Sequence, residues 1–285
     1  MFRFGVDTFI WSELFSEDDL WIVEKAQKLG FEVLDFAIAE PENFPTRAVK
    51  KELDKTELDP VLTTTLPDDG NLISPDKSKR ERGKELLKEL VDIGNELGAE
   101  VLGGVNYAAW GYLPGRPRNE EEWKRSVDAM REVAEYAQKT GEVDIAVEAI
   151  NRFETHFLNT AEDAVKYCED VGMDNVKVHL DTFHMNIEET DFTEAVKTCG
   201  SEYLGYVHTC ENTRGIPGTG LVPWREFFTA LKDIDYEGPL VIESFDPEFE
   251  ELNSKLAIWR NFAESGEELA VKGLENLKEI EDEIS

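Results

Sequence analysis

Four residues whose side chains could bind a divalent metal are spread at similar intervals along the chain. Glu148, Asp181, His208 and Glu243 are separated by 33, 27 and 35 residues. Three carboxylates and one imidazole, without a thiolate, form a donor set that suits Mn²⁺ or Co²⁺, with Mg²⁺ as a further candidate, better than structural zinc. Carboxylates that are buried together repel one another, so a cation is expected among them. The pattern predicts a metal site with these four residues as ligands.

Three further polar residues lie shortly after predicted ligands in the sequence. Glu154, His184 and Arg214 each lie three to six residues after a predicted ligand. On loops beside a metal site they could hold the hydroxyl groups of a small polyol, although ordinary loop ion pairs and caps are equally consistent with them. Trp110 is a candidate wall of the same pocket. His179 lies two residues before Asp181, and we expect it to be a buried neighbour rather than a ligand.

Each predicted ligand lies at or next to the end of a short β-rich run. Patterns typical of helices separate these runs along the whole chain. Leu86, Leu90, Ile93 and Leu97, for example, recur at helical intervals. Eight such runs in 285 residues give a repeat of about 36 residues, the length of one unit of a (β/α)8 barrel. The predicted strands are Phe2–Thr8, Glu32–Phe36, Pro60–Leu66, Glu100–Val105, Val143–Glu148, Asn175–Asp181, Tyr203–His208 and Pro239–Ser244.

A doubly wound open sheet is the alternative α/β architecture. Its Gly-x-Gly-x-x-Gly signature does not follow the first predicted strand, which also argues against a nucleotide cofactor. No linker divides the chain. We therefore expect one TIM-barrel domain spanning residues 1–285, in which residues from about 250 to 285 form an acidic helical extension on the barrel or on a partner subunit.

In such a barrel, catalytic groups lie at the carboxyl ends of the strands. The four predicted ligands occupy these ends in the last four strands. On the sixth strand, Val176, Val178 and Leu180 are apolar and should face the helices, which turns Asp181 into the barrel. The strand positions and the donor set thus lead independently to one site.

The charge of the chain excludes several classes of partner. Acidic residues number 62 against 30 basic ones, which gives a formal net charge of −32. Such a surface repels phosphate backbones and anionic lipid, so we expect neither nucleic-acid nor membrane partners. The first residues lack the basic start and apolar centre of a signal peptide. Three cysteines without a Cys-x-x-Cys spacing argue against disulfides and thiolate metal sites, and a cytoplasmic location is expected.

The same acidic bias is typical of proteins that work in concentrated salt, where the self-repulsion of the surface is screened. We expect activity and thermal stability to be higher in molar KCl than in low-salt buffer. A comparison of both quantities in the two buffers checks this, and equal values would contradict it.

The glycine-rich segment 215–220 follows the seventh predicted strand, where many barrels bind phosphate through backbone amides. That would indicate a phosphorylated substrate. Arg214 supplies the only nearby positive charge, and Gly-Pro sequences are common in simple turns. We therefore favour a turn.

Three segments resemble the ketose 3-epimerases of the D-tagatose/D-psicose (allulose) type, in the xylose isomerase-like barrel superfamily. They are Glu148-Ala-Ile-Asn-Arg-Phe-Glu154, Leu180-Asp-Thr-Phe-His-Met-Asn-Ile-Glu-Glu189 and His208-Thr-Cys-Glu-Asn-Thr-Arg214. Pro217-Gly-Thr-Gly220, Pro223-Trp224 and Trp259-Arg260 fit the same pattern. The resemblance covers most of the chain and is densest between Glu148 and Glu243.

The resemblance implies roles for these residues. Glu148, Asp181, His208 and Glu243 correspond to the family's ligands for Mn²⁺ or Co²⁺, and Glu148 and Glu243 also to its acid–base pair. The remaining correspondences concern the substrate: Glu154, His184 and Arg214 match positions that hold the O1 and O2 end of the sugar, and Asp7, Asn106 and Trp110 lie in segments near its other end. Around Asp7 and Asn106 the chain departs from the family's tyrosine-rich first strand and hydrophobic wall. The family usually forms homodimers or homotetramers.

The implied reaction is inversion of a free ketose at C3 through an enediolate. One glutamate removes the C3 proton, and the second returns a proton to the opposite face. An aldose–ketose isomerase on the same metal-binding barrel, acting on a sugar or a sugar phosphate, is the alternative enzyme. A sugar-binding or assembly protein without catalysis is the alternative from another class. A DNA-repair endonuclease is disfavoured by the charge and by a total of four histidines.

Overall fold

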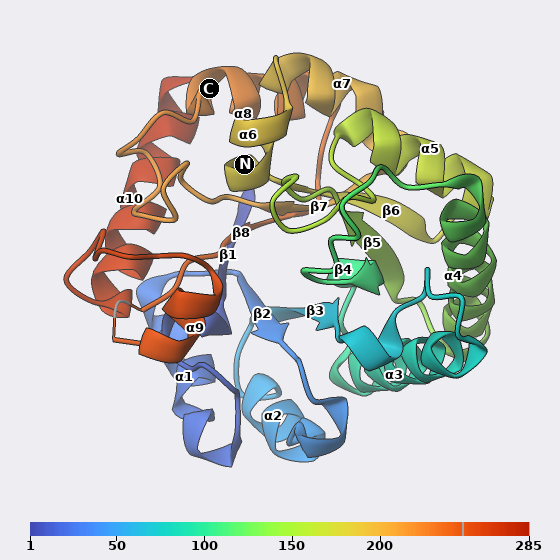
Figure 1. Ribbon diagram of the computed structural model, residues 1–285. Coiled ribbons are helices and arrows are strands. Elements are labelled where there is room, and N and C mark those ends of the chain that lie inside the picture. The colour runs from blue at the N-terminus through green and yellow to red at the C-terminus, as the bar shows by residue number, and fades with distance from the viewer. Residues whose placement is uncertain (247, 285) are drawn as a thin grey trace.

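The computed structural model describes residues 1–246 and 248–284 and shows a closed barrel of parallel strands surrounded by helices (Figure 1). Each strand pairs with its neighbours in the sequence, and β8 closes the barrel against β1. The strands are β1 (Arg3–Asp7), β2 (Val33–Ala37), β3 (Asp59–Leu66), β4 (Val101–Ala109), β5 (Asp144–Glu148), β6 (Val176–Asp181), β7 (Leu204–His208) and β8 (Pro239–Ile242). The predicted (β/α)8 fold is confirmed.

Helices follow the strands and surround the barrel, and the last two of them come after β8. They are α1 (Trp21–Leu29), α2 (Thr46–Leu53), α3 (Lys77–Leu97), α4 (Glu120–Thr140), α5 (Ala161–Val171), α6 (Thr182–Glu188), α7 (Phe192–Tyr203), α8 (Trp224–Asp233), α9 (Glu250–Lys255) and α10 (Gly266–Glu283). Short 3₁₀ helices cover Thr8–Ile10, Glu17–Asp19, Pro41–Asn43 and Asp68–Gly70.

The predicted strands agree with the observed ones to within one residue at most ends, and two ends differ. β4 continues four residues beyond the predicted end at Val105, because the chain bulges and then pairs again with β3 at Leu66 and Ala109. β8 ends at Ile242, so Glu243 is the first residue beyond the strand rather than part of it. Both differences lie at the edge of the site.

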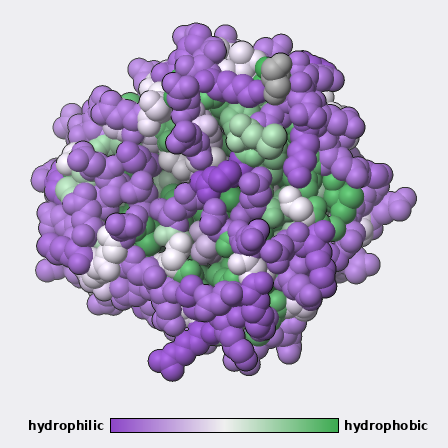
Figure 2. Space-filling model, turned by 180° about the vertical axis from the view of Figure 1, so that it is seen from behind, coloured by the Kyte–Doolittle hydropathy of each residue, from purple (hydrophilic) through white to green (hydrophobic). Residues whose placement is uncertain are grey.

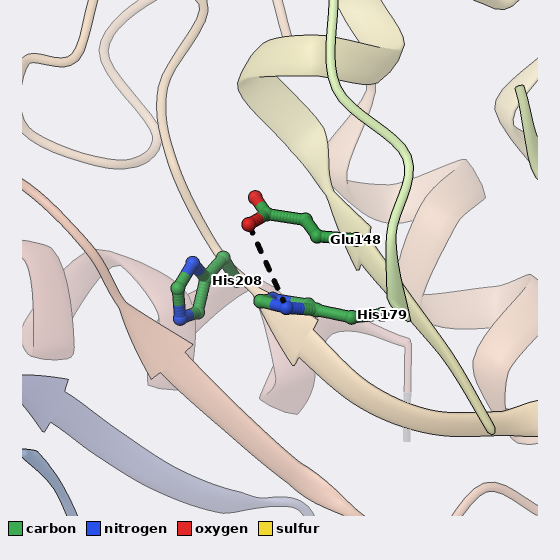
Figure 3. A group of neighbouring side chains, drawn as sticks. All are labelled: Glu148, His179 and His208. Carbon is green, nitrogen blue, oxygen red and sulfur yellow. Dashed lines mark ion pairs between the residues drawn. The ribbon is translucent and has the colours of Figure 1, made fainter. Parts of the chain in front are cut away.

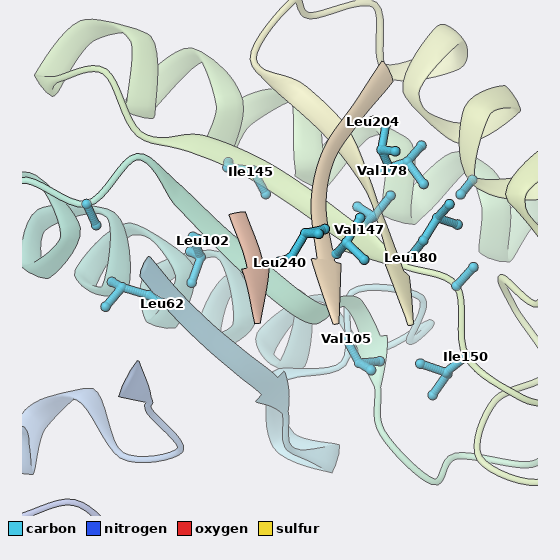
Figure 4. Packing of buried hydrophobic residues seen from close by; sticks show 14 of the residues in the cluster. Leu62, Leu102, Val105, Ile145, Val147, Ile150, Val178, Leu180, Leu204 and Leu240 are labelled. Atoms are coloured by element: carbon cyan, nitrogen blue, oxygen red, sulfur yellow. The ribbon is translucent and has the colours of Figure 1, made fainter. Parts of the chain in front are cut away.

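Alternation along the strands produces two core layers. Inside the barrel, small apolar residues and one tyrosine fill the end opposite the predicted site: Val33, Val61, Val101, Ala146, Tyr206 and Val241. Between strands and helices lies the larger layer, which includes Val178 and Leu180 (Figure 4). Burial of these residues removes apolar surface from water, which is the dominant stabilising term in folding. The prediction that Val178 and Leu180 face the helices and Asp181 the interior is confirmed.

The carboxyl-terminal region is helical, as expected. α10 lies beside α8 and β8 and buries Leu269, Leu274 and Leu277 (Figure 1). It therefore takes the position of the eighth barrel helix. α9 lies between β8 and α10, over the carboxyl ends of the strands, where it contributes to the cavity described below.

The surface agrees with the acidic composition. Seen from behind, the molecule is mostly hydrophilic, with scattered apolar residues (Figure 2). Within residues 1–246 and 248–284, none of the helices combines the length and apolar character needed to cross a bilayer.

Candidate active site

The four predicted ligands meet at the carboxyl ends of the strands. Glu148, Asp181 and His208 are the last residues of β5, β6 and β7, and Glu243 directly follows β8. Asp181 and His208 are fully buried, and the Glu243 side chain is 14% exposed. Asp181, His208 and Glu243 each place one ligand atom within 4.8 Å of the others, and Glu148 forms a second such group with Asp181 and His184. The four residues thus lie at the same end of the barrel, in two groups that share Asp181.

Arg214 inserts a positive charge into this acid cluster. Its Nη1 donates a hydrogen bond to Asp181 Oδ2 at 2.8 Å and another to Glu243 Oε2. The guanidinium lies over the Phe183 ring, with Cζ 4.1 Å from the centroid, which is a favourable cation–π arrangement. Arg214 is thus placed to hold an anion or hydroxyl against the carboxylates.

The backbone of Arg214 has a positive φ of 60°, which is uncommon for a residue with a side chain. Two contacts hold this conformation: the Arg214 N–H donates to the Glu211 carbonyl at 2.9 Å, and the Ser244 hydroxyl donates to the Arg214 carbonyl at 2.6 Å. Such strain persists only where the surroundings over-determine it, and it clusters at functional sites.

Burial and charge shift the pKa values of the cluster in different directions. Burial raises the pKa of Glu148 well above its usual range, and burial also raises that of Asp181 although Arg214 opposes the shift. Burial would raise the pKa of Glu243 too, but Arg214 and His208 outweigh it and hold that pKa well below its usual value. Burial lowers the pKa of His208, and the charge of Glu243 together with the hydrogen bond to Asp35 more than reverses this. The protein thus compensates the buried carboxylates with positive charge.

The donor atoms suit a divalent cation. Nδ1 of His208 is buried, has no hydrogen-bond partner in the described part of the chain, and lies 3.5 Å from Glu243 Oε2. An unpartnered imidazole nitrogen facing carboxylate oxygens is the arrangement that Mn²⁺, Co²⁺ and Mg²⁺ sites use. These residues therefore fit the predicted metal.

His184 and Glu154 form a second polar group beside the cluster. The backbone N–H of Asn151 donates to His184 Nδ1 at 3.1 Å, and Arg214 Nη2 lies 3.2 Å from His184 Nε2. That Nε2 lies 3.7 Å from Glu148 Oε1. Glu154 accepts hydrogen bonds from the Asn151 side chain at 2.7 Å and from Trp110 Nε1 at 2.8 Å. The loops after β4 and β5 are thereby joined into one wall.

His179 is buried beneath these groups. Its Nδ1 accepts a hydrogen bond from the Gly104 N–H at 3.2 Å and lies 3.9 Å from Glu148 Oε2 (Figure 3). Its ring is perpendicular to that of His208, with 4.2 Å between centroids. Its Nδ1 is thus already an acceptor of a backbone hydrogen bond, and Glu148, His179 and His208 also form a group whose ligand atoms lie within 4.8 Å of one another.

A cavity of about 500 Å³ opens above the cluster. Six of the residues predicted to form the site line it: Glu148, Glu243, Glu154, His184, Arg214 and Trp110. Asp181 and His208 lie below it. Asp7 and Asn106 are fully buried and are not among the described residues that line the cavity, although Asp7 forms a group with Asp35 and His208 whose ligand atoms lie within 4.8 Å of one another. The Asn106 amide donates instead to the Ala146 carbonyl at 2.9 Å.

Sequence reasoning missed the apolar side of this cavity. It is lined by Phe9, Leu14, Phe245, Leu252 and Leu256. The last two come from α9 and the residue after it, and the backbone N–H of Leu252 donates to Glu13 Oε1 at 3.3 Å. Their spacing of four residues indicates a shared helical face, but nothing in the sequence directs that face to the cavity.

The glycine-rich loop after β7 is a turn whose amides are already bound. The buried Glu211 carboxylate accepts hydrogen bonds from the backbone N–H groups of Asn212, Gly218 and Val222 at 2.9, 2.9 and 3.1 Å, and from Trp224 Nε1 at 3.1 Å. Within segment 215–220, the Gly218 amide is thus already bound by an internal carboxylate. The predicted turn is confirmed, and Glu211 is a structural residue to which the sequence analysis gave no role.

Comparison with known proteins agrees with this geometry. Residues 23–280 match the family described as xylose isomerase-like TIM barrel. The chain is 36% identical to the L-ribulose 3-epimerase of Mesorhizobium japonicum over 92% of this chain and 88% of that protein. It is also 36% identical to the D-psicose 3-epimerase of Ruminiclostridium cellulolyticum over 93% and 92% of the two chains.

Solved structures give the same result. The D-allulose 3-epimerase from Methylomonas sp., crystallised in complex with D-allulose, superposes with a TM-score of 0.92 at 34% identity and covers 98% of this chain and 96% of that one. Fold, cluster and sequence identity over nearly the full length agree, and the chain therefore belongs to the ketose 3-epimerases of the xylose isomerase-like TIM barrel family, which are isomerase-class enzymes.

Proposed function

We propose that this enzyme inverts C3 of a free ketose of the D-tagatose, D-psicose or D-fructose kind with the help of a divalent metal, Mn²⁺ or Co²⁺ and alternatively Mg²⁺. The observation that carries the proposal is the pair of carboxylates, Glu148 and Glu243, that enter one cavity from different strands. Glu148 ends β5 and Glu243 follows β8. Because β6 and β7 lie between these two strands in the barrel, the two carboxylates approach a bound sugar from different sides.

Each residue has a role in this reaction. One of Glu148 and Glu243 accepts the C3 proton, and the other donates a proton to the opposite face of the same carbon. Arg214 supplies hydrogen-bond donors for the O1 and O2 end of the ketose, His184 presents its ring nitrogen Nε2, and Glu154 supplies an acceptor. The burial of these groups excludes water from the reacting carbon and strengthens the interactions around it.

Glu148, Asp181, His208 and Glu243 would hold the metal. When bound, it would supply positive charge next to the ketose carbonyl and stabilise the negative charge that develops as C3 loses its proton. The donor set and the unpartnered Nδ1 of His208 support this assignment.

The cavity favours a neutral sugar over a phosphorylated one. Six carboxylates line it against the two cationic side chains of Arg214 and Lys255, and Arg214 is already engaged by Asp181 and Glu243. A phosphate dianion would be repelled by such a lining. The loop that could have bound phosphate through its amides is bound by Glu211. We therefore propose unphosphorylated ketoses as substrates.

The setting of the reaction is part of the proposal. The three free cysteines, Cys168, Cys199 and Cys210, are all buried, which agrees with a reducing compartment, and we place the enzyme in the cytoplasm. We also propose that it works as a homodimer or homotetramer, as the resemblance implies.

NMR in D₂O with Mn²⁺, KCl and a panel of ketoses tests the function directly. The panel comprises tagatose, psicose, fructose, sorbose, ribulose and xylulose. We expect deuterium at C3 together with the appearance of the C3 epimer, and the initial rates rank the substrates. Deuterium at C1 with the appearance of an aldose would contradict the proposal in favour of the isomerase. The absence of exchange with every free sugar would contradict the assignment of unphosphorylated substrates.

A further inference from the structure

A further buried carboxylate, that of Asp35, lies inside the barrel next to Nε2 of His208. Asp35 is on β2, where it shares the inward face with Val33 and Ala37, and it is fully buried. His208 is on β7, and β8 and β1 separate these two strands in the barrel. Their contact therefore crosses the interior, with His208 Nε2 3.2 Å from Asp35 Oδ2.

Two hydroxyl groups hold the Asp35 carboxylate in place. The Tyr206 hydroxyl donates to Asp35 Oδ2 at 2.5 Å, and the Thr63 hydroxyl lies 3.1 Å from each carboxylate oxygen. A carboxylate that accepts hydrogen bonds from two strands at once has little rotational freedom. Asp35 is thus a fixed acceptor at the base of the site.

This arrangement decides which nitrogen of His208 carries the proton. Nε2 faces Asp35 and also the Tyr206 oxygen, at 3.2 Å. The Tyr206 proton is used toward Asp35, so both neighbours of Nε2 are acceptors and Nε2 must be the donor. In the neutral ring the lone pair is then on Nδ1, which faces Glu243.

The rings around His208 limit its rotation. His179 lies perpendicular to it at 4.2 Å between centroids, and Tyr206 lies at 5.0 Å (Figure 3 shows His179 and His208). His179 is itself held by the Gly104 N–H. The His208 ring is therefore restrained by packing, while the proton position within it is determined by Asp35.

We propose that Asp35 is a positioning residue that keeps His208 in the Nε2–H form with Nδ1 directed at the site formed by Asp181 and Glu243. The inference rests on the proposed function, because it assumes that this site binds a divalent metal. Carboxylates that accept the second N–H of a metal-binding histidine typically change metal affinity by 10- to 100-fold when they are replaced.

Two substitutions separate positioning from mere packing. Asp35→Leu removes the acceptor and keeps an apolar side chain of similar length, whereas Asp35→Asn retains one oxygen that can still accept from Nε2. We expect Mn²⁺ affinity, measured by calorimetric titration without sugar, to fall roughly 10- to 100-fold in Asp35→Leu and less in Asp35→Asn. Asn175→Ala is the control, since it removes a buried hydrogen bond to the Ala134 carbonyl at the amino end of β6 and should leave Mn²⁺ affinity unchanged.

The tautomer is an independent readout in the metal-free protein. Long-range ¹H–¹⁵N NMR of the four histidines is recorded at alkaline pH, where the His208 ring is neutral despite its raised pKa. With His208 assigned by its loss in His208→Gln, the spectra should show the Nε2–H form in the unsubstituted enzyme and a mixture of forms in Asp35→Leu. Unchanged Mn²⁺ affinity and an unchanged tautomer in Asp35→Leu would overturn the inference and leave the proposed function intact. If the unsubstituted enzyme bound no divalent metal, both would fail.

Discussion

Replacing Glu243 by glutamine is expected to lower ketose turnover by about 10³-fold at saturating Mn²⁺. A general acid or base typically contributes 10²- to 10⁴-fold, and an amide can neither accept nor donate the C3 proton. Glutamine keeps one oxygen that could still bind a metal. Turnover at increasing Mn²⁺ concentrations, together with metal affinity, therefore separates the loss of the base from the loss of a ligand.

The matching variant Glu148→Gln makes the test sharper. If the two carboxylates serve opposite faces of C3, each variant retains one of them and can still exchange the C3 proton of one epimer with D₂O. We expect Glu243→Gln and Glu148→Gln to incorporate deuterium into different epimers of the same pair, while neither converts one epimer to the other. Glu264→Gln, an exposed residue before α10, is the control for the change in net charge.

Two results would contradict the two-carboxylate mechanism. One is turnover above about a tenth of the original rate in either variant, which is far more than removal of an acid or base permits. The other is deuterium incorporation at C3 of the same epimer by both variants, which would show that a residue other than Glu148 and Glu243 exchanges the C3 proton.

Truncation of Glu211 is expected to cause the largest loss of stability among the site substitutions. Glu211→Ala removes the acceptor of three backbone N–H groups and of Trp224 Nε1, all of which lie beneath the loop after β7. Buried donors left without acceptors cost about 1–3 kcal/mol each, reduced where water can enter. We expect the free energy of unfolding to fall by about 3–5 kcal/mol, which corresponds to a decrease in Tm of roughly 10 °C.

Urea denaturation and thermal unfolding measure this effect. Glu226→Ala on α8 is the matched control, because Glu226 is exposed and such changes are usually within about 0.5 kcal/mol. A stability of Glu211→Ala close to that of the control would show that the loop does not depend on this carboxylate. The variant should also lose activity, because loosening of this loop displaces the backbone carbonyl of residue 211, which accepts the hydrogen bond that holds the strained backbone of Arg214.

The ligand cluster could be predicted from the sequence because each step depends on local information. Short apolar runs separated by helical periodicity identify the strands, and alternation within a run decides which side chains face inward. The last residue of each run is then at the catalytic end of the barrel. Glu148, Asp181 and His208 follow this rule, and Glu243 lies one residue beyond it without leaving the cluster.

The same rule applies to β2. Asp35 shares the inward face with Val33, and Leu34 and Phe36 face the helices, just as Asp181 shares its face with His179. Its partner is not determined by its own strand, however, because contact with His208 requires the barrel to close and the strands to stagger until β2 and β7 face each other. Asp7 and Asn106, which the resemblance places near the far end of the sugar, are both fully buried and do not line the cavity.

The sequence by itself determined the barrel, the four polar residues at the carboxyl ends of its last four strands and the family, since these follow from periodicity and from short motifs. Only the tertiary structure decided the apolar wall contributed by α9, the filling of the glycine-rich loop by Glu211 and the contact between Asp35 and His208. The physical reason is that periodicity reports the direction of a side chain, whereas its partners depend on how distant segments approach when the barrel closes.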